Sequence, residues 1–163
     1  MENKQTQKAF IFYFLMNLIL LDFGNQIRKL SFNSYFDNYS NPIFSITHTT
    51  NTGSAFGLFS NNSIPLALFG ILVIGFLVYY IYKNVTFNDK LELTAITLFS
   101  SGALGNLIER IKFGYVIDYI NLNFIDFPIF NAFDIMICFG VFLYFIFVII
   151  DLKAENGNSD KSR

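Results

Sequence analysis

The chain has 163 residues, of which 53% are hydrophobic, 19% aromatic and only 14% charged, and its mean hydropathy is +0.46. Soluble domains average about 25% charged residues, so this composition indicates a membrane protein, and the length allows a single domain. The formal net charge of −1 argues against a nucleic-acid partner, and the single cysteine excludes an intramolecular disulfide or a cysteine-based metal cluster.

Four apolar stretches predict four transmembrane helices, at about residues 9–29, 64–82, 91–111 and 131–150. The first also has the length of a signal-peptide core, but no small-residue cleavage site follows it, so we expect a retained anchor. The second carries no charge, matches a hydrocarbon core of about 30 Å, and begins with Pro65, which suits the first turn of a helix. The third contains several polar side chains, and the fourth is polar only at its start.

The connecting segments predict the remaining architecture. Residues 30–63 are too long for a simple connector, and the alternation after Ile43 predicts a small strand-containing unit outside the cytoplasm. We therefore expect an all-α membrane protein in which residues 1–152 form one four-helix domain. Residues 153–163 are small and charged, and are predicted to be a disordered cytoplasmic tail.

The distribution of lysine and arginine predicts the orientation of the helices. With both termini in the cytoplasm, seven of these residues lie inside and four outside, which agrees with the tendency of positive charge to remain inside. This orientation places residues 30–63 and 112–130 together on the outer face.

The third span ends in a polar motif. Gly102, Asn106 and Arg110 are spaced by four residues and therefore lie along one helical face. One interpretation is a structural seam between helices, with Arg110 anchored to lipid headgroups. The other is a functional site, because two aspartates follow within 24 residues.

Asp118 and Asp134 are these two aspartates, and carboxylates at membrane depth usually mark function or a buried partner. Held together by the fold, two carboxylates share a proton, so that one activates a water molecule while the other polarises a carbonyl group. The alternative interpretation is that either residue is a helix N-cap instead; Asp134 stands near a helix start, where the helix dipole favours negative charge.

A third motif precedes the second span. Asn51 offers groups that can bind a peptide backbone, and Gly53 permits a positive φ, although an ordinary turn is an alternative interpretation. His48 is the only histidine, and we expect a surface role for it rather than catalysis.

Three blocks of the sequence resemble the lipoprotein signal peptidases, the type II signal peptidases of bacteria. These blocks are Asn51-x-Gly-x-Ala-Phe56, then Gly102-Ala-x-Gly-Asn106-x-x-Glu-Arg110 with Val116-x-Asp118-Tyr, and finally Phe130-Asn131-x-x-Asp134. The resemblance covers about residues 10–150, including the four spans.

The resemblance implies a multi-pass aspartic endopeptidase of the bacterial inner membrane that needs no metal or cofactor, and we expect it to be a monomer. Its substrates would be prolipoproteins carrying a diacylglyceryl group, cut before the lipidated cysteine near the outer face of the membrane. Asp118 and Asp134 would be catalytic. The pocket and substrate backbone would be held by Asn51, Gly53, Asn106, Arg110 and Asn131.

The chain also departs from the family pattern. Asn25 and Glu109 each stand where the family usually has aspartate, with Asp22 a candidate substitute for the first, and Phe133 replaces a small alanine and is predicted to narrow the pocket. These changes leave open a catalytically inert relative that binds lipidated peptides. A small transporter is a third hypothesis, but it predicts ionisable residues near the bilayer midplane, whereas here they cluster at one end.

Overall fold

The computed structural model of the protein describes residues 2–36, 39–53 and 62–161. Within these ranges the chain forms the helices α1 (Glu2–Ser31), α2 (Ile64–Asn84), α3 (Lys90–Phe113) and α4 (Ala132–Lys161), and the strands β1 (Phe44–Asn51) and β2 (Val116–Leu122). Each helix contains a segment that is long and apolar enough to cross a membrane. The predicted four-span fold, with a strand between the first two spans, is confirmed.

One boundary differs from the prediction. Helix α4 continues to Lys161 and so includes most of the tail that its composition predicts to be disordered. The apolar part of the helix supplies the nucleus, and each added residue then gains a backbone hydrogen bond at little further cost.

Helix α3 is the central helix of the bundle, which explains its polar content. In its apolar segment 61% of the residues are buried, against 6–17% for the other three spans. Its small polar side chains bond to neighbouring helices: the hydroxyls of Ser100 and Ser101 both donate to Asn17 Oδ1 of α1, at 3.2 and 2.8 Å. Such hydrogen bonds join helices in lipid, where no hydrophobic force drives them together.

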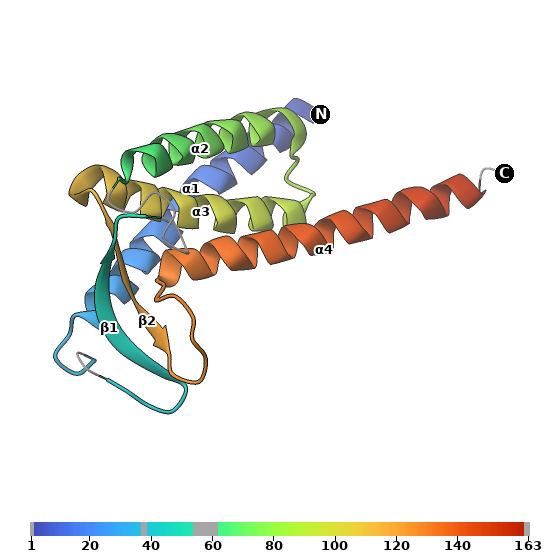
Figure 1. Cartoon of the computed structure of the whole chain (residues 1–163). Helices are drawn as coiled ribbons and strands as arrows, with labels where there is room; N and C mark the ends of the chain where they lie inside the picture. Colours follow the sequence, from blue (N-terminus) through green and yellow to red (C-terminus); the bar gives the residue numbers. More distant parts are fainter. Residues whose placement is uncertain (1, 37–38, 54–61, 162–163) are drawn as a thin grey trace.

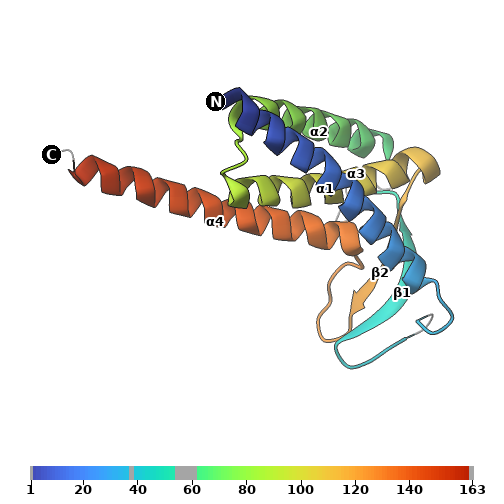
Figure 2. The same cartoon turned by 180° about the vertical axis from the view of Figure 1, so that it is seen from behind.

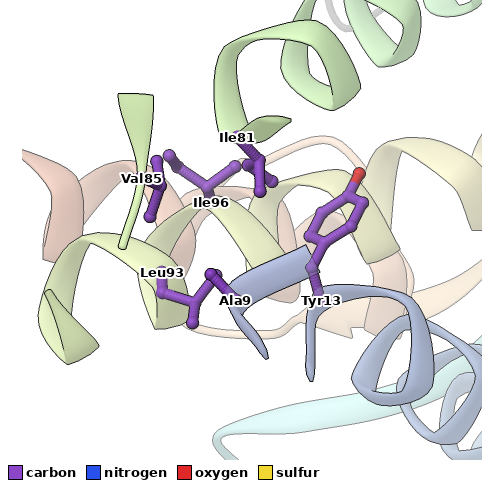
Figure 3. Packing of buried hydrophobic residues seen from close by; sticks show 6 residues of the cluster. All are labelled: Ala9, Tyr13, Ile81, Val85, Leu93 and Ile96. Atoms are coloured by element: carbon purple, nitrogen blue, oxygen red, sulfur yellow. The ribbon is translucent and has the colours of Figure 1, made fainter. Parts of the chain in front are cut away.

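Two further contacts hold the bundle together. Gly102 of α3 and Gly140 of α4 allow the backbones of these helices to approach closely, because a Cβ atom at either position would collide with main-chain atoms of the other helix. At the end of the bundle away from the strands, buried side chains from α1, α3 and the end of α2 form an apolar cluster (Figure 3).

The two strands form an antiparallel sheet at one end of the helices, while both described ends of the chain lie at the other (Figures 1 and 2). Gly114, with φ of 81°, ends α3 in the left-handed conformation and turns the chain directly into β2. Strand β1 pairs with β2 so that Thr49 lies opposite Asp118 and Asn51 opposite Val116. After β2 the chain folds back, and Phe130 pairs with Ile120, which brings the start of α4 beside Asp118.

Candidate active site

Asp118 lies on β2 with its side chain buried, and only 2% of the residue is exposed. Its two carboxylate oxygens accept hydrogen bonds from two asparagines. Asn51 Nδ2 donates to Oδ2 at 2.9 Å, and Asn131 Nδ2 donates to Oδ1 at 2.7 Å. The carboxylate is thus held on both sides by neutral amides that arrive from β1 and from the start of α4.

Asp134 lies in the first turn of α4 and takes part in its N-terminal cap. Its Oδ2 accepts the main-chain N–H of Asn131 at 3.0 Å, while Asn131 Oδ1 accepts the N–H groups of Phe133 and Asp134 at 2.7 and 3.1 Å. This reciprocal arrangement is a capping box built from asparagine and aspartate. Asp134 Oδ1 remains available for Asn106 Nδ2, which donates to it at 2.8 Å.

Asn131 connects the two carboxylates. It is 1% exposed, and its Nδ2 donates to both Asp118 Oδ1 and Asn106 Oδ1, at 2.7 and 3.2 Å. Both of its amide hydrogens and its side-chain oxygen are therefore engaged within the protein. The fold brings together the two aspartates and the two asparagines, Asn106 and Asn131, that the sequence indicates.

Arg110 and Gly53 lie next to this cluster. Arg110 Nη2 donates to the carbonyl of Gly53 at 3.0 Å, which ties the end of β1 to α3. The N–H of Gly53 donates to Asn51 Oδ1 at 3.0 Å, so the turn of the alternative interpretation is present. The positive φ that glycine permits is not adopted at Gly53: among the described glycines it occurs at Gly114. The remaining residues of this block, Ala55 and Phe56, lie outside the described residues.

A cavity of about 590 Å³ opens beside the carboxylates, and one end of it is polar while the rest is apolar. The polar end is formed by Asn51, Asn106, Arg110, Asp118 and Asp134. The apolar part follows the loop after β2 and one face of α4, with Phe127, Pro128, Phe130, Ile135, Phe139 and Phe142. Phe139 and Phe142 are more than half exposed, at 52% and 56%, so this wall continues onto the surface that faces lipid in a membrane.

The surroundings favour a proton on the carboxyl pair. Burial raises the pKa of Asp118, and the negative charge of Asp134 raises it further, while the amides of Asn51 and Asn131 and the guanidinium of Arg110 oppose this shift.

Within the part of the chain that the structure describes, no group of three or more His, Cys, Asp or Glu side chains is placed to hold a metal ion.

Phe133 stands beside Asp134 in the sequence, but its side chain does not line the cavity. The prediction that it narrows the pocket is wrong, because its ring is 3% exposed and packs in a slot against Gly24 of α1 and Gly105 of α3. Glycine at both positions makes room for the large side chain.

Asp22 does not replace an aspartate at position 25, because it is exposed and contacts Gln26.

Tyr119 belongs to the sequence block around Asp118, but no role was predicted for it. It is 2% exposed, and its hydroxyl accepts the N–H of Ala132 at 3.1 Å, which satisfies another free amide at the start of α4. Burial raises the pKa of this hydroxyl to about 12, so it stays neutral. The available signals were its position next to Asp118 and its place in the block that resembles the family.

Comparison with known proteins gives a consistent result. The sequence model of the family described as Signal peptidase (SPase) II matches residues 14–150. A lipoprotein signal peptidase of Streptococcus thermophilus is 40% identical over 116 residues, which cover 71% of this chain and 73% of that protein. A protein of the same name from Streptococcus pyogenes serotype M1 is 35% identical over 138 residues, covering 82% and 90%.

Solved structures agree with the sequence comparisons. A bacterial membrane enzyme determined by the in meso method at 2.3 Å resolution is similar with a TM-score of 0.72 and 31% identity, over 90% of each chain. A second such structure, at 1.9 Å resolution, is similar with a TM-score of 0.68 and 30% identity.

Proposed function

Because the chain belongs to the signal peptidase II family, we propose that it is an aspartic endopeptidase that removes the signal peptide from prolipoproteins carrying a diacylglyceryl group. The cut falls before the lipidated cysteine. The observation that carries the proposal is the arrangement of Asp118 and Asp134, which share one cluster of amide donors at the polar end of an apolar cavity.

The catalytic dyad works without a covalent intermediate. In a buried site two neighbouring carboxylates do not both ionise readily, so one keeps a proton. The ionised carboxylate removes a proton from a water molecule, whose oxygen attacks the scissile carbonyl carbon. The protonated carboxyl donates a hydrogen bond to the carbonyl oxygen. As the C–N bond breaks, the leaving amine takes the proton that the other carboxylate removed from the water.

The surrounding residues divide into two groups. Asn106 and Asn131 position the carboxylates, since their amide groups bond to the dyad and to each other. Asn51 and Gly53 lie at the end of β1, and Arg110 of α3 contacts Gly53 there, where an extended substrate backbone can bind along the cavity. The apolar wall at Phe139 and Phe142 suits a lipid-modified segment that enters sideways from the membrane.

We place the sheet and the dyad on the outer face of the inner membrane, with both termini in the cytoplasm. The distribution of lysine and arginine supports this orientation. So does the position of the sheet, at the end of the bundle opposite the two described chain ends (Figure 1). We also propose that the protein acts as a monomer.

The test is cleavage of a diacylglyceryl-modified prolipoprotein by the purified protein in lipid vesicles. Asp118→Asn and Asp134→Asn are each expected to abolish product while the protein still inserts and folds. Asp126→Asn is the matched control, because this exposed aspartate lies between the other two in the chain and outside the cavity. Cleavage at the wild-type rate by either dyad variant would contradict the mechanism.

A catalytically inert relative that binds lipidated peptides is the second candidate, and Asp134 in a capping box is the observation that favours it. Such a protein retains the lipopeptide on the vesicles without forming product. A well-folded wild-type protein that behaves in this way would replace the peptidase proposal.

A further inference from the structure

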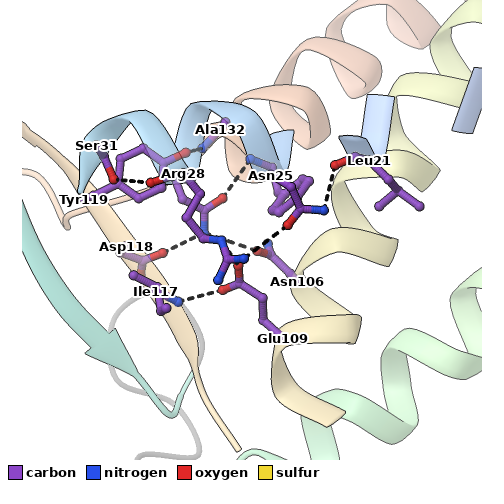
Figure 4. Close-up of polar contacts among 12 residues, drawn as sticks. Leu21, Asn25, Arg28, Ser31, Asn106, Glu109, Ile117, Asp118, Tyr119 and Ala132 are labelled. Atoms are coloured by element: carbon purple, nitrogen blue, oxygen red, sulfur yellow. Dashed lines mark hydrogen bonds and ion pairs between the residues drawn. The ribbon is translucent and has the colours of Figure 1, made fainter. Parts of the chain in front are cut away.

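Glu109 of α3 joins two parts of the protein that lie outside the proposed dyad. Its side chain is buried, with the residue 4% exposed. Glu109 Oε2 accepts the main-chain N–H of Ile117 at 2.8 Å, and Oε1 lies 3.5 Å from Arg28 Nε of α1 (Figure 4). Ile117 is the residue directly before Asp118, so the carboxylate of Glu109 is hydrogen-bonded to β2 next to the proposed dyad.

Arg28 is in turn held in place by its own helix. Its Nη2 donates to Asn25 Oδ1 at 3.4 Å, and Asn25 Nδ2 donates to the carbonyl of Leu21 at 2.9 Å. Asn25 and Glu109, which both stand where the family usually has aspartate, therefore belong to one connected network. In Figure 4 it runs from α1 through Arg28 and Glu109 to β2.

The strand needs such an anchor because its pairing with β1 is irregular near the dyad. The register shifts between Ile46 and Thr49 of β1, and Thr49 is the partner of Asp118. A register shift interrupts the regular ladder of backbone hydrogen bonds. Glu109 supplies a fixed contact to β2 from the helix bundle, independent of β1, at the residue before Asp118.

We propose that Glu109 and Arg28 are positioning residues that set the location of Asp118 by holding β2 against α3. The proposal rests on the proposed peptidase activity for its kinetic consequence. A buried ion pair that only joins α1 to α3 is the rival interpretation, and it predicts a loss of stability with no separate loss of turnover.

The experiment compares Glu109→Ala and Glu109→Gln with the wild-type protein. Glutamine keeps an oxygen that can accept the Ile117 N–H, whereas alanine removes it. Glu92→Gln is the matched control: Glu92 is also a buried glutamate of α3, 5% exposed, and it accepts a hydrogen bond from Tyr80 at 2.7 Å, outside the cavity beside the dyad. For each variant, kcat and KM on the diacylglyceryl-modified prolipoprotein and the midpoint of unfolding are measured.

We expect kcat to fall by about 10- to 100-fold in Glu109→Ala with KM within about twofold, since a displacement of about 1 Å in a catalytic group has effects of this size. Glu109→Gln should recover most of kcat, and Glu92→Gln should keep wild-type kcat whatever its midpoint. Arg28→Gln should lower kcat less than Glu109→Ala, because the bond to Ile117 remains. Unchanged kcat in Glu109→Ala, or an equal loss in Glu92→Gln, overturns the proposal.

A second readout needs no substrate and so separates this proposal from the proposed function. Amide hydrogen exchange in residues 116–122 should become at least about tenfold faster in Glu109→Ala and stay unchanged in Glu92→Gln. Unchanged exchange in Glu109→Ala refutes the anchoring of β2, whether or not the wild-type protein cleaves prolipoprotein. An inactive wild-type protein with the expected exchange pattern would refute the peptidase function alone.

Discussion

Replacing Phe133 by alanine should loosen the contact between α1, α3 and α4 instead of widening the active-site cavity. The ring is 3% exposed and lies in the slot between Gly24 and Gly105, away from the residues that line the cavity. Truncation of a buried phenylalanine costs about 3–5 kcal/mol in protein cores. We expect about 3 kcal/mol here, because the separated helices remain in lipid and lose packing contacts without exposure to water.

The assay is reversible unfolding in mixed micelles, read as the free energy of unfolding. Phe145→Ala, on the same helix but 64% exposed, serves as the control and should change this free energy little. Gly105→Ala should itself cost about 1–3 kcal/mol, because the added methyl group overlaps the ring of Phe133. In the double variant the methyl group enters the vacated space, so its loss should be smaller than the sum of the single losses by at least about 1 kcal/mol.

Additive losses in the double variant would refute this packing argument. So would a Phe133→Ala protein that unfolds like the wild type but has an altered KM or accepts bulkier substrates, because that result would place the ring in the cavity.

Two further predictions concern the amides around the dyad. Since burial raises the pKa of Asp118, the alkaline limb of the plot of kcat/KM against pH should lie above the ordinary pKa of aspartate. Asn51→Ala should move this limb to still higher pH, because it removes a hydrogen-bond donor to the ionised carboxylate. An alkaline limb that does not move, or that moves to lower pH, in Asn51→Ala would contradict the role of Asn51 as a donor to ionised Asp118. The folded protein binds this proton more tightly than the unfolded chain, so the free energy of unfolding should fall as pH rises from the ordinary pKa of aspartate to the raised pKa of Asp118. Asn131→Asp keeps the oxygen that caps α4 but places a carboxylate against Asp118, so cleavage should fall at least about 100-fold with the helix intact by circular dichroism. Asn131→Ala should in addition lose about 1 kcal/mol of stability with the cap, and wild-type turnover in either variant would show that Asn131 does not position the dyad.

The spans were predictable because each depends on local composition. Residues 64–82 are apolar without interruption, and the helix found there begins and ends within two residues of the prediction. The polar residues of the third span were a weaker signal for a membrane helix. They are accommodated because α3 is surrounded by the other helices, an arrangement that no local pattern specifies.

Strand β2 was not predicted, although its sequence carries a signal. Val116, Ile117, Tyr119 and Ile120 are β-branched or aromatic, and the strand follows a glycine that ends a helix. The aspartate in its middle made it look like a loop. Only the pairing with β1, which comes from more than 60 residues earlier in the chain, shows that Asp118 is an inward-facing strand residue.

The roles of single side chains were harder to predict than their presence in the site. Asn131 was expected to shape the pocket and hold substrate, and its hydrogen bonds to Asp118, to Asn106 and to the start of α4 could not be read from the sequence. Phe133 was expected to face the pocket because it adjoins Asp134. On a helix adjacent residues point about 100° apart, so the neighbour of a site residue commonly packs elsewhere.

The two interpretations of Asp134, helix cap and member of the proposed dyad, are compatible because one set of bonds serves both. A polar cap must begin α4, since the free N–H groups of its first turn need partners where the apolar segment starts. Asn131 and Asp134 meet that need through one oxygen each, which leaves Asn131 Nδ2 to bond Asp118 and Asp134 Oδ1 to accept from Asn106. The dyad geometry is thus a consequence of how the helix begins. Fraying of this first turn would loosen both carboxylates at once, so Asn131→Ala, which removes the capping oxygen, should lose turnover and the integrity of the α4 cap together, whereas Asn131→Asp should lose turnover alone.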